Sequence, residues 1–400
     1  MADVYPSYYN DFTCIGSKCS DSCCIGWKID VDLACHNKHL ELNKKSGDKH
    51  IDRFLMSSNP SVSKFSSIKK KKNGNCSFLD ESNLCSIQRR FGEDYLPDTC
   101  QTFPRRRVNF DEINVKTLSL ACPEAARLCL TKKNSMEIHS GEKQGNNFLK
   151  IVPSYLHNSF TRVGELLFNK IYFLFKDENF NLPTLIIICE NMLNEQNNLE
   201  KNPEKIDSIL DFMKDEFKDL SFLNCDRSGS KLTFLTDLNN FTKKLDSKWP
   251  IRQILSKAHK DLVEKYPQPE EAKINFKDLE KKLDTYCRSK KNNISRNYFL
   301  NEILGNAQIF TNQSANCRNR FYLIILYSII SRLITIASLS HKQEYDEKIH
   351  LNAIQKVMKY HGFFVRSDGN QEFKLHPEIL LALKKIDKNS VFNSLFLLFG

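Results

Sequence analysis

The chain has 400 residues, 40% of them hydrophobic, and carries 28 phenylalanines, a composition typical of a folded protein with a sizeable core and not of a disordered one. Its formal net charge of +11 favours an anionic partner, such as nucleic acid, an acidic protein surface or a phosphate-bearing molecule, although a solvated lysine-rich surface gives the same count. The first residues lack the basic and apolar regions of a secretory signal, so we expect a cytoplasmic protein, in which clustered cysteines indicate metal binding or catalysis and not disulfides.

Cysteines crowd the beginning of the chain. Four of the 14 cysteines stand within eleven positions, at Cys14, Cys19, Cys23 and Cys24. Thiolates at this density repel one another and oxidise readily unless a metal ion, an iron–sulfur cluster or disulfides takes up the sulfur. After them we expect a short strand within 26–32, a helix over 36–49, and a loop or exposed hairpin over 57–75 with solvated lysines at 69–72.

A second cysteine block runs from Cys76 to Cys122. Pro123 and Glu124 suit the first turn of a helix, which places Cys122 at its N-terminus, where the helix dipole lowers the pKa of a thiol. Cys129 falls on the apolar side of that helix and is predicted to be a core residue. The two blocks together supply a pool of eight candidate metal ligands: Cys14, Cys19, Cys23, Cys24, Cys76, Cys85, Cys100 and Cys122.

The spacing of these eight cysteines bears on the metal they bind. None of them forms the C-x2-C pair that zinc sites commonly use. A 4Fe-4S cluster also takes four thiolates and tolerates irregular spacing better. Neighbouring side chains point apart in most backbone conformations, so we do not expect Cys23 and Cys24 to bind one zinc ion, although they could serve different sites. The pattern favours a 4Fe-4S cluster, with structural zinc open as the alternative.

Four residues near the cysteines are candidate cofactor-binding residues. Trp27 could shield a cluster from water, and Arg105 and Arg106 present anion-binding donors close to Cys100. Asp30 is a candidate for holding a substrate amine or orienting an arginine.

The sequence assigns no catalytic residue. It contains no P-loop, nucleophile elbow or H-E-x-x-H motif, and no G-x-G-x-x-G between a strand and a helix. A lone histidine such as His361 is expected to be structural.

The rest of the chain has a helical pattern. Residues 132–148 are polar and contain glycine, which indicates a domain boundary. Beyond it, apolar residues recur at helical spacing over 156–175, 182–199, 206–222, 232–245, 251–266, 274–287, 298–310, 321–339, 349–360 and 379–399. We predict a mostly α protein with an irregular cysteine-rich α+β domain over 1–133, a linker over 134–148, and an all-α domain over 149–400.

One of these segments, 321–339, is long enough to span a bilayer. Arg332 lies inside it and is costly in lipid. We therefore predict a buried central helix, in which Arg332 meets an internal carboxylate or an anionic ligand, and not an integral membrane protein.

Several motifs resemble the flagellin lysine-N-methylase family. They cover about the first third of the chain closely, and the string 119–130 is the most specific of them. The early cysteines alone also resemble a wider group of zinc- or iron-chelating cysteine-cluster domains. The motifs are Cys14-x4-Cys19-x3-Cys23-Cys24-x2-Trp27-x2-Asp30, Cys76-x-Phe78-Leu79, Cys85-x-Ile87-Gln88, Leu96-Pro97-x2-Cys100, Phe103-Pro104-Arg105 and Leu120-x-Cys122-Pro123-Glu124-Ala125-Ala126-Arg127.

The resemblance implies methylation of lysine side chains on flagellin, S-adenosylmethionine as the methyl donor, an iron–sulfur cluster in the cysteine-rich part, and a helical domain that holds substrate and donor. With flagellin as the partner, no stable nucleic-acid partner is expected. Methyl transfer needs a neutral lysine amine that attacks the sulfonium, assisted by a group that takes the proton. Two rival functions stay open: a zinc-stabilised module that binds nucleic acid or protein, and a cysteine-cluster redox protein without methyl transfer.

Overall fold

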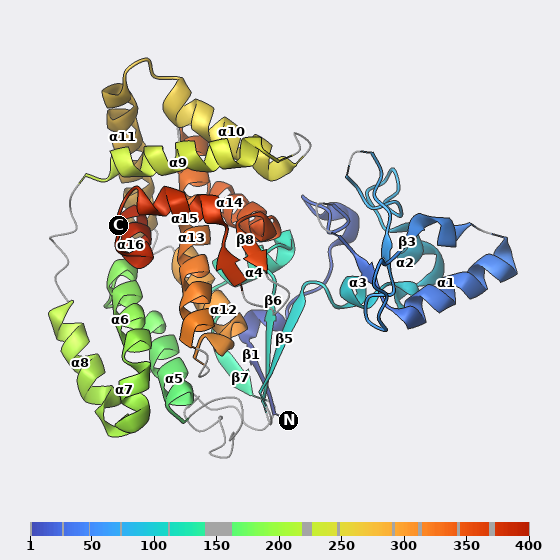
Figure 1. The fold of residues 1–400 in the computed structure, drawn as a ribbon, viewed down its shortest axis with the longest axis horizontal. Coiled ribbons are helices and arrows are strands. Elements are labelled where there is room, and N and C mark those ends of the chain that lie inside the picture. The colour runs from blue at the N-terminus through green and yellow to red at the C-terminus, as the bar shows by residue number, and fades with distance from the viewer. Residues whose placement is uncertain are drawn as a thin grey trace.

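The computed structural model describes residues 2–399 except 26–27, 48, 73, 111–112, 141–161, 218–225, 246–248, 290–292, 311–313, 342–344 and 368–372. The described chain is mostly helical, as predicted, and forms a large helical body with a smaller cysteine-rich lobe beside it (Figure 1).

A four-stranded sheet lies at one end of the body and combines the beginning of the chain with residues beyond 100. Its strands are β1 (Ala2–Pro6), β5 (Arg105–Phe110), β6 (Ile113–Leu118) and β7 (Ile138–Ser140), in the order β5-β6-β1-β7. β1 runs parallel to β6 and antiparallel to β7. Val4, Val115 and Leu118 of this sheet are buried in the core of the helical body.

The cysteine-rich lobe has its own small antiparallel sheet, formed by β2 (Asp30–Val31), β4 (Ser66–Ile68) and β3 (Phe54–Met56) in that order. Its helices are α1 (Leu33–Ser46), α2 (Ser86–Phe91) and α3 (Asp98–Thr102). Asp32 caps α1 by accepting a hydrogen bond from the backbone N–H of Cys35, and α1 ends at Gly47, whose φ of 68° suits glycine. The short strand and the helix predicted here are confirmed.

The segment 57–75 differs in one respect from its prediction. It does contribute to a hairpin, because β3 pairs with β4. β4 is buried and not exposed, since it is the central strand between β2 and β3.

The helical segments predicted for the rest of the chain are helical within the described residues, but 182–199 and 379–399 each form two helices and not one. α4 (Pro123–Thr131) begins after Cys122, as expected. The later helices are α5 (Arg162–Lys176), α6 (Leu182–Asn194), α7 (Gln196–Lys201), α8 (Ile206–Glu216), α9 (Ser228–Lys243), α10 (Pro250–His259), α11 (Pro269–Ser289), α12 (Ile294–Gly305), α13 (Ser314–Leu339), α14 (Glu347–Lys359), α15 (Pro377–Lys384) and α16 (Val391–Phe399). A hairpin of β8 (Val365–Ser367) and β9 (Phe373–Leu375), which the sequence did not predict, separates α14 from α15.

α13 is the central helix of the body. Its portion Arg318–Leu339 is long and apolar enough to cross a membrane, but 78% of the apolar window is buried by the surrounding protein. Arg332 lies within it and binds Asp284 at 2.7 Å and Glu280 at 3.2 Å. The prediction of a buried helix with an internal carboxylate partner is confirmed.

The two hydrophobic cores divide the chain differently from the boundary expected at 134–148. Among the described residues, the buried members of the lobe's hydrophobic core lie between Ile29 and Leu96. The core of the body includes Val4, Tyr8, Leu120 and Met136 together with the helices. Because β1 pairs with strands beyond residue 100, the first residues belong to the body. Residues 141–148 of the expected linker lie outside the described residues.

Candidate functional site

Four thiols from the two cysteine blocks meet in the lobe. The thiol of Cys24 lies within hydrogen-bonding reach of the sulfurs of Cys23, Cys76 and Cys85. The backbone brings the blocks together, because the N–H of Cys76 donates to the carbonyl of Cys24 at 2.9 Å. We refer to Cys23, Cys24, Cys76 and Cys85 as the thiol cluster.

Three members of the thiol cluster have a lowered pKa. Hydrogen bonds from Cys24 lower the pKa of Cys23 and Cys76 to about 7 and that of Cys85 to about 6, while the pKa of Cys24 itself is raised. The nearby backbone N–H groups of Gln88 and Ile87 at the start of α2 also lower the pKa of Cys85. The thiolate, which is the form that binds metals, is thus accessible near neutral pH at three of the four positions.

Two further groups border the thiol cluster. Cys100 lies beside it. Burial is the main cause that raises the pKa of the Cys100 thiol well above the ordinary value, and the nearby Cys85 and Cys76 raise it further. The ammonium of Lys70 is buried and has no hydrogen-bond partner among the described residues. Burial lowers the pKa of Lys70, and the nearby sulfurs of Cys76 and Cys24 act in the opposite direction. Lys70 is therefore not the solvated lysine expected from its run, and its charge complements an anionic centre.

The other three cysteines of the predicted pool lie near one another. Cys14 and Cys19 both act electrostatically on Cys122. Cys122 occupies the N-cap position of α4 as predicted, and the nearby backbone N–H groups of Ala125 and Glu124 act to lower the pKa of its thiol. The predicted lowering of its pKa is nevertheless wrong, because burial outweighs these N–H groups and raises the pKa of Cys122 to about 11.

The expectation that Cys23 and Cys24 point apart is also wrong. The chain turns at these two residues, and both sulfurs belong to the thiol cluster. Among the described residues, no group of three or more histidine, cysteine, aspartate or glutamate side chains has an arrangement that could hold a metal ion as it stands. Within the thiol cluster, the thiol of Cys24 contacts each of the other three sulfurs.

A buried carboxylate fixes the loop of the first cysteines to the body. Oδ1 of Asp21 lies 2.7 Å from Nζ of Lys359, and Oδ2 lies 2.6 Å from Nζ of Lys356, both on α14. Gln355 joins them by donating to Asp21 Oδ2 at 3.1 Å and to the carbonyl of Ala121 at 2.8 Å. Although burial alone would raise it, hydrogen bonds from the two lysines lower the pKa of Asp21 to about 2. We call this contact the Asp21 anchor.

A cavity of about 520 Å³ lies between the lobe and the body and reaches the thiol cluster at Cys23. We call it the inter-lobe cavity. The lobe contributes Cys23 and Lys28, the region around the four-stranded sheet contributes Phe103, Ser119 and Ala121, and the helical part contributes Trp249, Met358, Lys359, Tyr360, His361 and Gly362.

His361 presents a basic nitrogen in this cavity. Its Nδ1 lies 2.7 Å from the carbonyl oxygen of Met358. Because a carbonyl only accepts, Nδ1 carries the proton and Nε2 keeps its lone pair. Desolvation by the surrounding protein lowers the pKa of His361. The side chain that the sequence assigns a structural role is thus a neutral imidazole in the lining of the cavity.

The four predicted cofactor-binding residues have different surroundings. Trp27 lies outside the described residues. Asp30 binds Lys28 of the inter-lobe cavity at 3.0 Å. Arg105 lies over the ring of Phe12, with 5.5 Å between the guanidinium carbon and the ring centroid.

Arg106, the fourth, binds within the body. It donates to Glu302 at 3.1 Å and to the carbonyl of Gly305 at 3.1 Å. Its guanidinium thus joins β5 to α12. The sequence reasoning missed Trp249, Lys359 and Tyr360, which carry no motif and reach the site only through the packing of the helices.

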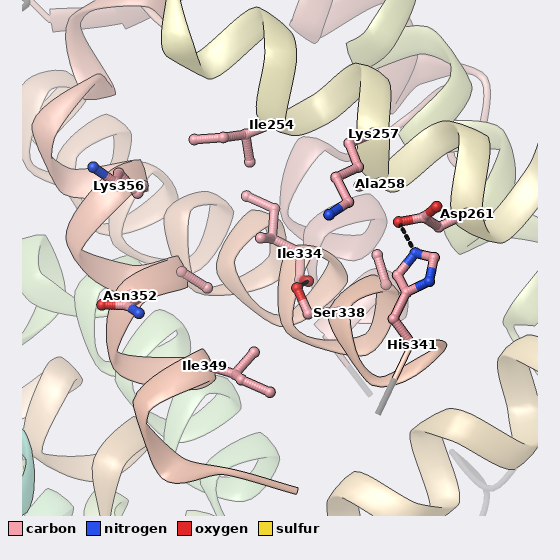
Figure 2. Close-up of a pocket in the computed structure, with 12 residues that line it drawn as sticks. Ile254, Lys257, Ala258, Asp261, Ile334, Ser338, His341, Ile349, Asn352 and Lys356 are labelled. Atoms are coloured by element: carbon pink, nitrogen blue, oxygen red, sulfur yellow. Dashed lines mark hydrogen bonds and ion pairs between the residues drawn. The ribbon is translucent and has the colours of Figure 1, made fainter. Parts of the chain in front are cut away.

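A second cavity of about 460 Å³ lies along α13 and α14, and its described lining contains no cysteine. Figure 2 shows its apolar wall of Ile254, Ile334 and Ile349, and at one end His341, whose Nε2 binds Oδ2 of Asp261 at 2.7 Å. Lys356 lies at the other end and belongs to the Asp21 anchor. The thiol cluster adjoins the inter-lobe cavity and not this one.

Comparison with known proteins places the chain in a family. No family model and no solved structure matches it. It is 33% identical over 155 residues to the flagellar biosynthetic protein FliU of Salmonella muenchen, a match that covers 38% of this chain and 90% of that protein. It is also 33% identical over 134 residues to the lysine-N-methylases of Salmonella choleraesuis and Salmonella typhimurium, and spans a third of their length. The chain therefore belongs to the family of FliU and the lysine-N-methylases.

Proposed function

We propose that the protein is a cytoplasmic lysine N-methyltransferase that acts on flagellin with S-adenosylmethionine as the methyl donor and holds a 4Fe-4S cluster at the thiol cluster. The names of the relatives support the reaction and the flagellar substrate. The observation that carries the proposal is the inter-lobe cavity, which connects the thiol cluster with an aromatic wall.

The lining of the inter-lobe cavity suits a methyl transfer between two cations. The sulfonium of S-adenosylmethionine and the ammonium of lysine are both attracted by aromatic rings, and Phe103, Trp249 and Tyr360 supply such rings. The volume lies within the roughly 300–1,000 Å³ of small-molecule sites. Asp21 offsets part of the charge of Lys359, although the same carboxylate also binds Lys356, so the repulsion of a bound cation is reduced and not abolished.

The lysine must lose a proton before it attacks the methyl group. The lone pair on Nε2 of His361 can accept that proton, because the bond from Nδ1 to Met358 fixes the tautomer. In this scheme the aromatic wall orients the two reactants, and His361 takes the proton.

The donor set of the thiol cluster fits a 4Fe-4S cluster. Cys23, Cys24, Cys76 and Cys85 would supply the four thiolates that such a cluster takes. The ammonium of Lys70, which has no hydrogen-bond partner among the described residues, would offset its negative charge. When bound, the cluster would cross-link the two cysteine blocks and could transfer electrons.

Metal analysis of the protein purified without oxygen tests the cluster. We expect iron and sulfide to be bound by the native protein and lost in Cys24→Ser and Cys85→Ser. Cys14→Ser is the matched control, because Cys14 is exposed and lies outside the thiol cluster, and it should keep the iron. Zinc in place of iron would overturn the cluster, and iron retained by both cluster variants would overturn the choice of ligands.

Mass spectrometry of flagellin tests the reaction. Flagellin incubated with the purified protein and S-adenosylmethionine should gain the mass of one or more methyl groups on lysines, and Trp249→Leu and Tyr360→Leu should reduce the gain. Flagellin from cells that lack the gene should be unmethylated. An unchanged flagellin mass in the first experiment and in the deletion strain would refute the methyltransferase.

A further inference from the structure

A third cavity, of about 460 Å³, lies on the side of the body away from the cysteine-rich lobe. It is formed by α6, α13 and the beginning of α16, which Figure 1 shows at the opposite side of the molecule from α1, α2 and α3. Its lining is mainly polar and includes Glu190, Asn191, Asn194, Arg318, Tyr322 and Asn393.

One carboxylate oxygen of Glu190 has no hydrogen-bond donor among the described residues. The residue is only 4% exposed. Its Oε1 accepts from the Tyr322 hydroxyl at 2.8 Å and from Asn194 Nδ2 at 3.4 Å. Its Oε2 is buried and has no partner among the described residues. A buried carboxylate oxygen without a donor is unfavourable, and a small rotation of the Glu190 side chain toward the cavity that it lines would let a ligand donate to Oε2.

A positive charge lies at a short distance from this carboxylate. Arg318 Nη1 donates to Oδ1 of Asn194 at 3.1 Å, while the amide nitrogen of the same side chain donates to Glu190. One side-chain amide thus spans the gap between a carboxylate and a guanidinium. The guanidinium has five N–H donors, so it can hold Asn194 and still bind a carboxylate.

We propose that this cavity binds a free α-amino acid. Its ammonium donates to Oε2 of Glu190, its carboxylate binds Arg318, and Asn191 and Asn393 favour a polar side chain. Glu190 and Arg318 together match the two opposite charges of a zwitterion. Either charge alone would not distinguish a zwitterion from a simple cation or anion. The site is separate from the inter-lobe cavity, so it does not depend on the function proposed above.

Ligand-observed NMR and calorimetry on the full chain test the site. We would screen the standard L-amino acids, with L-glutamine as the first probe, and expect at least one to bind. The N-acetyl derivative, which lacks the ammonium, and the α-amide, which lacks the carboxylate, should each bind about tenfold more weakly or worse, because each loses a charge-assisted hydrogen bond.

Two variants and a control locate the binding. Glu190→Gln keeps the shape of the side chain and Arg318→Met changes an exposed residue, so one of them reports even if the other does not fold. Both should weaken binding about tenfold or more. Glu195→Gln, the same substitution just beyond α6, should bind like the native protein. The proposal fails if no amino acid binds, if acetylation makes no difference, or if neither variant weakens binding. Methylation of flagellin is measured separately, so each proposal can fail alone.

Discussion

At the scale of single residues, the candidate site depends on His361. It stands just beyond α14 and has no sequence motif around it, so the sequence alone assigns it a structural role. The structure gives it two features of a general base: a fixed tautomer and a position in the inter-lobe cavity.

The pH dependence of methylation should report on His361. Its pKa is lowered from the ordinary value of 6.5, so the imidazole is neutral above the lowered pKa and becomes protonated as the pH falls through it. The acid limb of the rate should therefore lie at a lower pH than an ordinary histidine would give. His361→Gln should reduce kcat by about 100-fold or more and remove this limb of the profile.

His341→Gln provides the matched control, because His341 lines the second cavity and binds Asp261. It should leave both the rate and the profile unchanged. If His361→Gln behaves as His341→Gln does, His361 has only a structural role.

The cysteines show how much of the candidate site can be predicted from residue patterns. Their density predicts a set of ligands shared by the two blocks, and Cys24 does meet Cys76 and Cys85. Which four of the eight candidate cysteines meet was not predictable. Their meeting depends on the turn at Cys23 and on the backbone hydrogen bond from Cys76 to Cys24. Spacing along the chain contains neither piece of information.

At the scale of elements, α12 passes very close to the four-stranded sheet. A Cβ atom at Gly305 would lie 2.9 Å from Thr117 Oγ1 and 3.0 Å from the guanidinium of Arg106. The same guanidinium binds Glu302 one turn earlier. Only glycine allows this approach without moving the ion pair.

Gly305→Ala should therefore lower the free energy of unfolding by about 1–3 kcal/mol, measured by urea denaturation, because the added methyl group displaces Arg106 or the helix. Gly229→Ala is the control. Its Cβ would meet the side chain of Lys273 at 3.3 Å, which can move aside, so the change should stay within about 0.5 kcal/mol or be stabilising. Equal losses in both variants would show that the contact at Gly305 is not special.

The Asp21 anchor holds the first cysteine loop against α14. In Asp21→Asn, Lys359, whose side chain is 6% exposed, would stay buried beside a neutral amide. We expect a loss of about 3 kcal/mol in the free energy of unfolding. Asp52→Asn, at an exposed aspartate of the same lobe, should have little effect. An Asp21→Asn protein as stable as the native one would contradict the anchor.

The Asp21 anchor also predicts that the free energy of unfolding falls at acid pH. The folded pKa of Asp21, about 2, is below the ordinary value of 3.8, so its contribution is complete above about pH 4 and is lost as the pH falls through about 2. The native protein should lose roughly 2 kcal/mol over this range that Asp21→Asn does not lose.

The helices were predictable and the four-stranded sheet was not. A helix repeats its apolar residues within a single segment, so its pattern is visible locally, as in α13 and α14. β1 pairs with residues more than 100 positions away, at Ile113–Val115 and Ile138–Ser140. The sequence of a five-residue strand does not indicate which other strands it pairs with.

At the scale of the whole molecule, the two lobes have cores of very different size. Among the described residues, the hydrophobic core of the cysteine-rich lobe contains ten buried hydrophobic side chains. Small domains of this kind commonly need a metal or disulfides in order to stay folded. The core of the body is far larger and contains α13.

If the proposed cluster is bound, its removal should therefore unfold the lobe and spare the body. After anaerobic treatment with a chelator, hydrogen exchange should increase in α1 and β4 while α13 stays protected. Cys24→Ser, which lacks the proposed ligand from the start, should give the same pattern without chelator. Loss of protection in α1 and α13 together would show that the molecule unfolds as one unit.

The pairing of β1 with β6 has a consequence for how the molecule can move. The chain leaves the body after Phe12, builds the lobe, and returns at β5, so the lobe is an insertion held by two tethers, which reach the sheet at β1 and β5 on either side of β6. The outgoing tether carries Cys14, Cys19, Cys23 and Cys24, and the returning one follows Cys100. Any swing of the lobe must bend both tethers. A metal that joins Cys24 to Cys76 and Cys85 would stiffen this double hinge and so set the width of the inter-lobe cavity.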